Sequence, residues 1–340
     1  MYFCFMILVT GGTGLLGSHL LYELMKDDTR KVRALYRDHS RITKVKSIFD
    51  YYSKGVPHRF DDIEWVQGDV LDLFSLEEAL DGINMVYHCA AMVSFHKRDF
   101  KKMVQINRLG TANMVNMSLK VGVKKFGFVS STAALGGKEN VPVTESDKWQ
   151  ITPTTSGYSI SKFNSEREVW RACEEGMDVV IINPCLIFGA GDYDESSLSI
   201  FRTVSKGLKI YSPGSNAYVD ARDVATCFVR LMNSEVKNEQ FLVVAHNLTF
   251  KSSLIAIANK MGVKQPSFCP PKWMALFIAK CLEFFSGLLK RRSTISVDSA
   301  RSAYSKMSYS NEKLLKTINH QFYSFDETIE NVITFHKLHN

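Results

Sequence analysis

Residues 8–17, L-V-T-G-G-T-G-L-L-G, constrain the fold of this chain more than any other segment. The apolar residues 5–9 have the composition of a buried parallel strand, and glycines follow where a helical pattern begins. A strand, a glycine turn and a helix in this order are typical of dinucleotide binding. Gly11 permits the tight turn, Gly14 lets the backbone approach a pyrophosphate, and Gly17 lets the helix pack closely on the strand. Other expected cofactor contacts here are Thr13, Leu15 and Leu16.

The chain has 340 residues, enough for one large domain or for a domain with an appended lobe. It carries 42 Lys and Arg against 35 Asp and Glu, and the net charge of +7 is spread along the chain. Such a distribution favours an anionic small molecule over nucleic acid as partner. The seven cysteines are scattered and never form a C-x-x-C pair. We therefore expect reduced cysteines, no metal centre and a cytoplasmic protein.

Two hydrophobic segments bear on the membrane question. The first residues, M-Y-F-C-F-M, lack the basic region of a signal peptide, and Met1 and Met6 are both candidate starts. Residues 273–289 contain Lys280 and Glu283 and are shorter than a comfortable membrane span. We expect an amphipathic helix that packs on the protein, with attachment to a membrane surface as the alternative and integral insertion disfavoured.

Apolar strands alternate with helices through the first 190 residues. Strands are predicted at residues 5–9, 31–36, 63–67, 85–89, 126–129 and 179–182, and helices from residue 15 and at 74–80, 100–121 and 158–175. Residues 37–46 are interpreted as a basic segment. The alternation predicts an α/β fold, a Rossmann-type doubly wound parallel sheet with helices on both faces.

The later pattern is less regular, with helices expected at 198–206, 221–232, 252–261 and from 272, and a strand at 240–245. We predict a nucleotide-binding domain over residues 1–190, to which residues 215–250 return, and a smaller mixed α/β substrate lobe formed mainly by 191–340. The substrate is expected between them, outside the carboxyl ends of the strands.

Tyr158 and Lys162 stand four residues apart at the start of a predicted helix, so their side chains share one face. A phenol has a reference pKa of about 10, and a neighbouring ammonium favours its ionised form. Lys162 is therefore expected to bring Tyr158 toward proton transfer. Ser131 follows a predicted strand, where its hydroxyl can hold a substrate oxygen. Each feature alone also fits an ordinary helix pair or turn cap, and only their combination indicates catalysis.

With these motifs the chain resembles the extended short-chain dehydrogenases/reductases, the group that includes nucleotide-sugar epimerases and dehydratases. T-G-G-T-G-L-L-G matches that family's T-G-x-x-G-x-x-G, and Y-S-I-S-K matches its Y-x-x-x-K. The resemblance implies that Ser131, Tyr158 and Lys162 are the catalytic set, with Tyr158 as proton donor or acceptor and Lys162 also holding the nicotinamide ribose. The segments G-D-V, H-C-A-A and N-P-C-L-I-F-G and one asparagine imply further cofactor contacts at Asp69, Val70, Ala90, Ala91, Asn107, Pro184 and Ile187.

The form of the cofactor is argued from charge. NAD-preferring folds of this kind usually end the second strand in an acidic residue, whereas this strand ends in Tyr36 and Arg37. Arg37 can clamp a ribose 2′-phosphate, with Arg41 or Lys44 assisting. Asp38 comes one residue later and fits either an NAD site or an ion pair with Arg41. The charges favour NADP(H), and NAD(H) stays the alternative.

The segments V-R-A-L-Y-R-D and A-Y-V-D-A-R-D-V-A resemble the dihydroflavonol-reductase and 3β-hydroxysteroid-dehydrogenase branch. This implies a reductase that transfers hydride between NADPH and an aldehyde or ketone, or oxidises the matching alcohol. The alternatives are an NAD-dependent nucleotide-sugar epimerase or dehydratase and a non-catalytic nucleotide-binding scaffold. Cations in the lobe leave a sugar-diphosphate site open, namely Arg202, Lys206, Lys209 and Arg222.

Two further expectations concern the lobe and its substrate. We expect Arg222 and Asp223 to form an ion pair at a helix start. The residues expected near the small-molecule substrate are Val93, His96 and Thr132, with His96 equally consistent with a lone surface histidine. The sequence does not predict the substrate, and it leaves a homodimer open.

Overall fold

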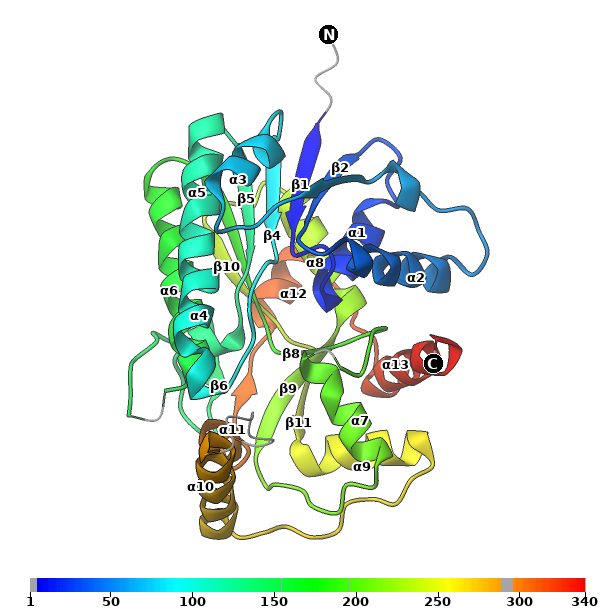
Figure 1. The fold of residues 1–340 in the computed structure, drawn as a ribbon, viewed down its shortest axis with the longest axis vertical. Helices are drawn as coiled ribbons and strands as arrows, with labels where there is room; N and C mark the ends of the chain where they lie inside the picture. The colour runs from blue at the N-terminus through cyan, green and yellow to red at the C-terminus, as the bar shows by residue number, and fades with distance from the viewer. Residues whose placement is uncertain (1–4, 154, 195, 289–295, 340) are drawn as a thin grey trace.

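The computed structural model describes residues 5–153, 155–194, 196–288 and 296–339. The candidate start Met1 and the last residue of the expected amphipathic helix, Leu289, lie outside the described residues. Figure 1 shows a central sheet covered by helices, with a smaller group of strands and helices at the end of the molecule opposite the N-terminus.

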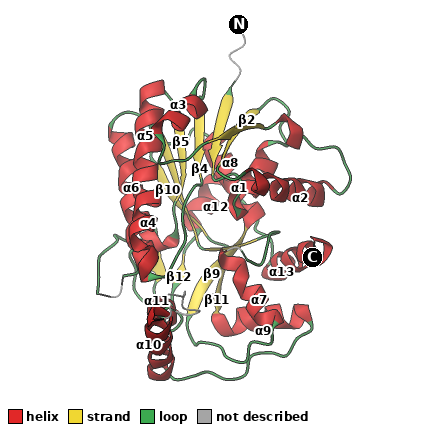
Figure 2. Cartoon of the chain, in the orientation of Figure 1, coloured by secondary structure: helices red, strands yellow, loops and turns green. Residues whose placement is uncertain are grey.

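A seven-stranded sheet forms the centre of the molecule, in the order β10-β7-β5-β4-β1-β2-β3 (Figure 2). Its strands are β1 (Met6–Thr10), β2 (Lys31–Tyr36), β3 (Glu64–Gln67), β4 (Met85–His88), β5 (Lys125–Val129), β7 (Asp178–Pro184) and β10 (Glu239–Val243). All neighbouring strands are parallel. The chain proceeds from β1 to one side and then returns to β4 on the other. The carboxyl ends of β1 and β4 therefore form the switch point at which such sheets bind ligands.

Helices cover both faces of this sheet, as a doubly wound fold requires. One face packs on α1 (Leu15–Leu24), α2 (Ile42–Ser53) and α8 (Ala221–Asn233), and the other on α3 (Leu73–Leu80), α5 (Gly110–Val121) and α6 (Gly157–Glu174). Residues alternate along β1, since Ile7 and Val9 join the first core and Leu8 joins the second. The predicted α/β fold with a parallel Rossmann-type sheet is confirmed.

Two segments show detail that the sequence analysis did not predict. The basic segment after β2 leads into the helix α2, because Ile42, Val45, Ile48 and Phe49 fall on one buried face while Lys44 and other polar residues face outward. The helix expected over residues 100–121 is present, and a π-helical turn divides it. It consists of α4 (Phe100–Val104), the π-helical turn at Gln105–Leu109 and then α5.

The smaller group of elements is built around a mixed sheet of β11 (His246–Thr249), β9 (Ser215–Asp220) and β8 (Leu186–Phe188), in that order. Helices α7 (Ser199–Ser205), α9 (Phe250–Met261) and α13 (Phe325–His339) share an apolar core with it. The chain between 215 and 250 thus contributes β9 and β11 to this sheet and β10 to the central one.

The remaining C-terminal elements are α10 (Lys272–Leu288), α11 (Val297–Ser302), β12 (Ser308–Tyr309) and α12 (Glu312–Ile318). β12 pairs with β6 (Pro142–Val143), which brings the late chain back to the loops that follow β5. Within the part of the chain that the structure covers, no helix combines the length and apolar character needed to cross a bilayer.

Candidate functional site

The glycine turn after β1 is fixed by close backbone contacts. Gly11 has φ +69°, and a Cβ there would lie 2.7 Å from the Ala90 nitrogen at the end of β4. A Cβ on Gly17 would lie 2.0 Å from the Gly11 carbonyl oxygen, well inside contact distance. Both positions therefore require glycine so that the turn, the next strand and α1 can meet.

Gly14 differs from these two glycines because it faces open space. A Cβ there would meet only the Gly11 carbonyl oxygen, at 3.4 Å. Gly14 is the N-cap of α1, and the first turn of that helix has no capping side chain and no acidic residue. The free N–H groups and the positive end of the helix dipole are thus available to an anion. The turn fits the pyrophosphate of a dinucleotide.

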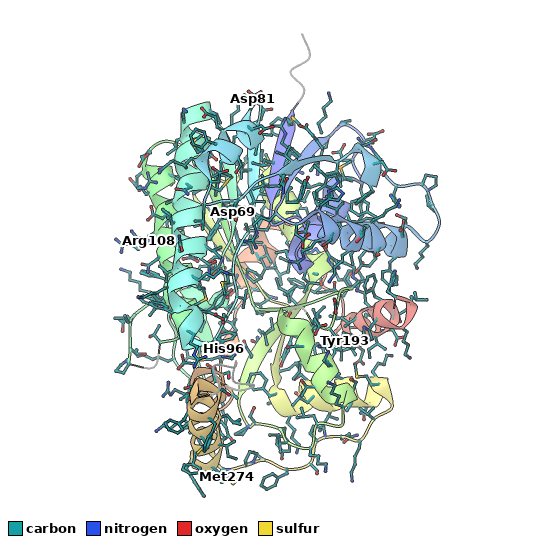
Figure 3. The ribbon with its side chains drawn as sticks, viewed as in Figure 1. Asp69, Asp81, His96, Arg108, Tyr193 and Met274 are labelled. Atoms are coloured by element: carbon teal, nitrogen blue, oxygen red, sulfur yellow. The ribbon has the colours of Figure 1, made fainter. Side chains whose placement is uncertain are left out.

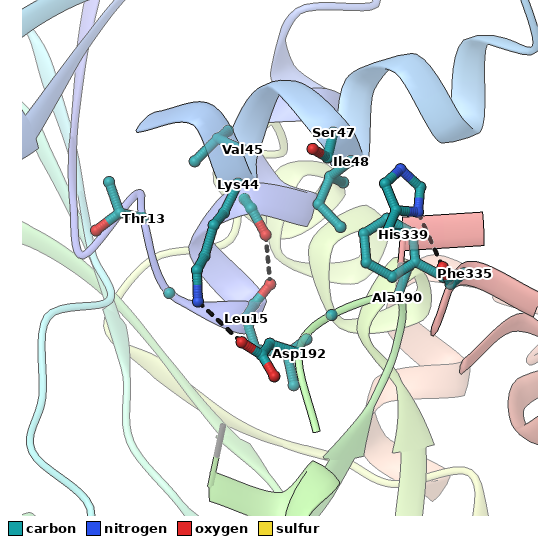
Figure 4. Close-up of a pocket in the computed structure, with 13 residues that line it drawn as sticks. Thr13, Leu15, Lys44, Val45, Ser47, Ile48, Ala190, Asp192, Phe335 and His339 are labelled. Atoms are coloured by element: carbon teal, nitrogen blue, oxygen red, sulfur yellow. Dashed lines mark hydrogen bonds and ion pairs between the residues drawn. The ribbon is translucent and has the colours of Figure 1, made fainter. Parts of the chain in front are cut away.

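A cavity of about 270 Å³ lies beside this turn, between the start of α1, α2 and the loop after β8 (Figure 4). Thr13 and Leu15 line it, together with α2 and the C-terminal helix α13. Lys44 reaches across from α2 and pairs with Asp192 at 3.0 Å (Figure 4). Because a carboxylate already balances Lys44, this lysine is a weaker candidate for a ribose phosphate than the sequence suggested. Leu16 is buried in the core beneath the turn.

Arg37 lies at the end of β2, with 64% of its side chain exposed, and its guanidinium is 3.7 Å from Asp69. Asp69 shapes its own turn by accepting a hydrogen bond from the Leu71 nitrogen at 2.9 Å (Asp69 is labelled in Figure 3). Asp38 accepts hydrogen bonds from the Ser40 nitrogen at 3.0 Å and the Ser40 hydroxyl at 2.7 Å. The carboxylate of Asp38 is thus used as a local cap.

The other predicted cofactor residues lie on both sides of the switch point. Val70 is buried against Gly110, where a Cβ would lie 2.6 Å from a Val70 methyl. Ala90 donates its N–H to the Thr10 hydroxyl at 3.3 Å, and Ala91 follows it at the surface. Pro184 ends β7, and Ile187 lies in β8 opposite Val219.

The three predicted catalytic side chains gather at the carboxyl end of β5. The Tyr158 phenol faces the Ser131 hydroxyl, which acts to lower the pKa of the phenol. Ser131 also accepts the Ala133 N–H at 3.2 Å, so it is a turn cap as well. Lys162, one turn further along α6, is 2% exposed and donates its ammonium proton to the Val129 carbonyl at 2.7 Å.

The electrostatics of Tyr158 differ from the expectation. Burial raises the pKa of Tyr158 above its ordinary value, and the Ser131 hydroxyl opposes this. The Lys162 ammonium is directed to the end of β5 and lies over the Phe128 ring, 4.7 Å from the centroid. Burial therefore sets the direction of the Tyr158 shift in this arrangement, and the expected lowering by Lys162 stays a prediction.

Glu166 completes this face of α6 and was missed by the sequence analysis. It is 5% exposed, and its Oε1 accepts from the side-chain amides of Asn183 at 2.6 Å and Gln240 at 3.2 Å. The Asn183 amide also donates to the Ser131 carbonyl at 2.9 Å, so the network extends to the catalytic loop. A carboxylate eight residues after Tyr158 and four after Lys162 is the signal that could have found it.

Burial has the largest effect on the pKa values of Glu166 and Lys162. It raises the pKa of Glu166 to about 7, and this shift is opposed by the Ser130 hydroxyl, the amides of Asn183 and Gln240 and the charge of Lys162. Burial also lowers the pKa of Lys162 to about 8, opposed by Glu166 and by Cys89. Each of the two charges thus helps to keep the other ionised near neutral pH.

Asn107, a predicted cofactor contact, joins two segments of the protein. It is 1% exposed in the π-helical turn, and its side-chain carbonyl accepts a hydrogen bond from the Met92 N–H at 2.7 Å. Its amide donates to the Met92 carbonyl and to the Ser161 hydroxyl, both at 2.9 Å. Since both amide protons are used inside the protein, Asn107 holds the loop after β4 against the catalytic helix.

The predicted substrate residues differ in how they lie relative to Tyr158. Phe95 packs against the Tyr158 ring, with 5.7 Å between the ring centroids. The predicted residue His96 lies in the loop before α4 (Figure 3). Val93 is exposed in the same loop. Thr132 acts on Tyr309 of β12, since burial raises the pKa of Tyr309 to about 12 and the Thr132 hydroxyl opposes this. Phe95 and Tyr309 are thus site residues that the sequence analysis missed.

The cations of the lobe are paired differently from the expectation. Arg222 donates to both oxygens of Asp220, at 2.9 and 2.7 Å, and stacks on Tyr323 at 3.7 Å. Asp223 instead pairs with His320 at 2.8 Å, so the predicted Arg222–Asp223 ion pair was wrong. Arg202 forms an ion pair with Asp194. Both arginines are therefore neutralised by carboxylates of the protein.

Residues 7–245 match the model of the NAD dependent epimerase/dehydratase family. The chain is 26% identical over 317 residues to a putative dihydroflavonol 4-reductase of Synechocystis sp., covering 91% of this chain and 88% of that protein. It is 28% identical over 272 residues to sterol demethylase protein B of Methylococcus capsulatus, covering 78% of each. The solved UDP-glucuronic acid 4-epimerase from Bacillus cereus, in complex with UDP-glucuronic acid and NAD, has a TM-score of 0.76 at 16% identity, covering 98% of this chain and 100% of that one.

The match spans the glycine turn, the catalytic helix and the strands that carry them. The resemblance to the extended short-chain dehydrogenases/reductases is therefore confirmed, and so is the expectation of an NAD(P)-dependent enzyme. The chain belongs to the NAD dependent epimerase/dehydratase family.

Proposed function

We propose that this protein is an NADP(H)-dependent oxidoreductase that reduces an aldehyde or ketone, or oxidises the matching alcohol, with Tyr158 as the acid/base. The observation that carries the proposal is the meeting of the Tyr158 phenol with the Ser131 hydroxyl at the end of β5. The glycine turn and the start of α1, which accommodate a pyrophosphate, follow β1 in the same sheet. We place the substrate between the nucleotide-binding part, residues 1–190 with 215–250, and the lobe of residues 191–340.

The bound cofactor supplies the hydride for the carbonyl carbon. Ser131 holds the carbonyl oxygen, and Tyr158 donates its phenolic proton to that oxygen as negative charge develops there. The raised pKa of Tyr158 keeps the phenol protonated, which suits an acid in the reducing direction. Lys162, protonated near neutral pH, holds the nicotinamide ribose and stabilises the phenolate that remains.

Arg37 supports the phosphorylated cofactor. Its side chain is mostly exposed at the end of β2, and its recorded ion pair, with Asp69, is long at 3.7 Å. A guanidinium in this position can form two charge-assisted hydrogen bonds with a 2′-phosphate. Asp38, the alternative partner for a 2′-hydroxyl, is occupied as a cap by Ser40.

A nucleotide-sugar epimerase or dehydratase is less well supported. Such an activity needs cations for the sugar diphosphate, and Arg222 and Arg202 are paired with Asp220 and Asp194. The name of the Synechocystis relative agrees with a reductase, and the likeness to the epimerase structure concerns the fold alone. Purified protein that retains tightly bound NAD(H) and converts a UDP-sugar would favour the epimerase instead.

The acid/base role is tested by Tyr158→Phe, with Tyr211→Phe in the lobe as the matched control. We expect Tyr158→Phe to lower turnover of a carbonyl substrate, identified from a panel of aldehydes and ketones, by at least a thousandfold, and to leave NADPH binding in place. The control is expected to keep both. Near-normal turnover by Tyr158→Phe would refute the assignment, and binding of NADPH without turnover of any carbonyl or UDP-sugar would favour a non-catalytic role.

A further inference from the structure

Helix α10 (Lys272–Leu288) extends from the end of the molecule farthest from the N-terminus (Figure 1). One of its faces packs on α11 through Ala279 and Leu276, which join a small apolar cluster. Glu283 fixes this contact, since its carboxylate accepts the Val297 N–H at the start of α11 at 2.9 Å. Met274 marks the end of α10 that lies far from the central sheet (Figure 3).

The opposite face of α10 is apolar and exposed. Its five large apolar side chains, with their exposed fractions, are Trp273 (71%), Phe277 (63%), Ile278 (46%), Phe284 (70%) and Phe285 (59%). At 3.6 residues per turn they lie within an arc of about 140°, and three of the aromatic rings within about 40°. Single exposed apolar residues are common on proteins, but a contiguous set of this kind marks an interaction surface.

The charge beside this face is positive. Lys280 is exposed and lies about 20° from Trp273 around the helix, whereas Lys272 lies about 100° from Trp273, on the side that packs on α11. Glu283 is the sole acidic residue of α10, and it is turned toward α11 and bonded there. Aromatic side chains with a lysine beside them and no exposed carboxylate among them fit the boundary between acyl chains and anionic headgroups.

The same charges disfavour a second copy of the chain as the occupant. A two-fold axis through this face would pair two copies of α10 either antiparallel about the middle of the helix or parallel and in register. Lys280 is the middle residue of the helix, so either pair would place it level with the Lys280 of the other copy. That arrangement brings like charges together, whereas an anionic surface attracts them.

We propose that the exposed face of α10, formed by Trp273, Phe277, Ile278, Phe284 and Phe285 with Lys280 beside it, attaches this protein to an anionic lipid surface. The aromatic rings insert at the depth of the headgroups, and the Lys280 ammonium extends to the phosphates. This attachment is peripheral, and it does not depend on the proposed reaction.

The test is co-sedimentation of the full chain with vesicles. One set consists of phosphatidylcholine alone and the other contains about one third phosphatidylglycerol, an anionic lipid. The variants are Phe284→Ser combined with Phe285→Ser, and Lys280→Glu. Phe74→Ser is the matched control, because Phe74 is 86% exposed on α3. Circular dichroism and thermal unfolding check that every variant folds, as expected for exposed positions.

We expect binding to the anionic vesicles, weaker binding to phosphatidylcholine alone, and a loss of binding as salt is added. The double phenylalanine variant should lower the partition coefficient at least tenfold and Lys280→Glu by several fold, with Phe74→Ser unchanged. No binding by the wild type, or equal binding by the double variant, would overturn the proposal. So would a concentration-dependent dimer in sedimentation velocity that the double variant abolishes, because the face would then bind a second copy.

Discussion

Glu166→Gln offers the sharpest test of how the catalytic face of α6 is tuned. The substitution removes the buried charge next to Lys162 and keeps an oxygen that can accept from Asn183. Above pH 7 the wild-type carboxylate is ionised and raises the pKa of Lys162, which lies at about 8 because burial lowers it more than Glu166 raises it. Without it Lys162 releases its proton at lower pH. The expected effect is therefore a loss of function on the alkaline side.

The size of the effect follows from the spacing on the helix. Side chains one turn apart are separated by about 6 Å, and at an effective dielectric constant of about 20 two unit charges there interact by roughly 3 kcal/mol, or about two pH units. The amides of Asn183 and Gln240 already stabilise the carboxylate and reduce this coupling. We expect the alkaline limb to move down by about one to two pH units, which is a loss of roughly 10- to 75-fold near pH 8.5.

The assay is the pH profile of kcat/KM for carbonyl reduction, with the pH dependence of NADPH binding as a second readout. Near pH 6 the wild-type carboxyl is mostly protonated, so variant and wild type should converge there. Cys89 and His88 are further titratable groups near Lys162. Burial raises the pKa of Cys89 to about 12 and lowers that of His88 to about 3. Neither group therefore changes its charge over the pH range of the profile. The observed limb belongs to the Lys162–Glu166 pair as a unit.

The matched control is Glu168→Gln, on the same helix, where the carboxylate pairs with Arg108 and Arg171 away from Lys162. It should leave the alkaline limb in place. If Glu166→Gln left the limb unmoved, or moved it to higher pH, the proposed coupling between Glu166 and Lys162 would be refuted. A loss of equal size at every pH would indicate a packing defect instead.

Two further predictions concern the cofactor. Gly17→Ala should lower the free energy of unfolding by about 3 kcal/mol, measured by denaturant titration, because its Cβ would lie 2.0 Å from the Gly11 oxygen. Gly14→Ala should fold normally and weaken NADPH binding, since its Cβ meets only that oxygen at 3.4 Å. Equal stabilities of the two variants would contradict this reasoning. Arg37→Ala should reduce the preference for NADPH over NADH, measured as the ratio of their calorimetric Kd values, about 10- to 100-fold. This corresponds to the loss of about 1.5–3 kcal/mol from charged hydrogen bonds to the 2′-phosphate. Lys44→Ala should change the preference less because Asp192 already pairs with Lys44, and the reverse ranking would assign the phosphate to Lys44.

The parts of the molecule that the sequence predicted correctly are set by local patterns. The glycine turn after β1 is specified within ten residues by the close approach of Gly17 to Gly11. The parallel strands are apolar runs bounded by turns, so their alternation with helices can be recognised without tertiary information. The same reasoning could have found α2, whose buried residues Ile42, Val45 and Phe49 follow helical spacing despite the basic residues between them.

The parts that it missed depend on contacts between distant segments. Asn107 received a cofactor role by analogy, but its partners at Met92 and Ser161 are fixed by how the π-helical turn meets the catalytic helix. Tyr309 reaches Thr132 because β12 pairs with β6, a pairing between segments more than 160 residues apart. In the loop after β4, the choice between Phe95 and His96 is one of side-chain direction, which a sequence pattern does not define.

The residues of the candidate site come from two kinds of segment, the helix α6 and more distant surface segments. Tyr158, Lys162 and Glu166 project from one face of a single helix and are anchored to the ends of β5, β7 and β10. Phe95 and Tyr309 approach the same place from a surface loop and from the C-terminal segment. The proposed proton-transfer groups are therefore held by the buried sheet, whereas the groups expected around the substrate belong to segments that can change without disturbing that sheet. This separation explains why the helix and the glycine turn indicate a reaction class in the sequence, while they leave the choice of substrate open.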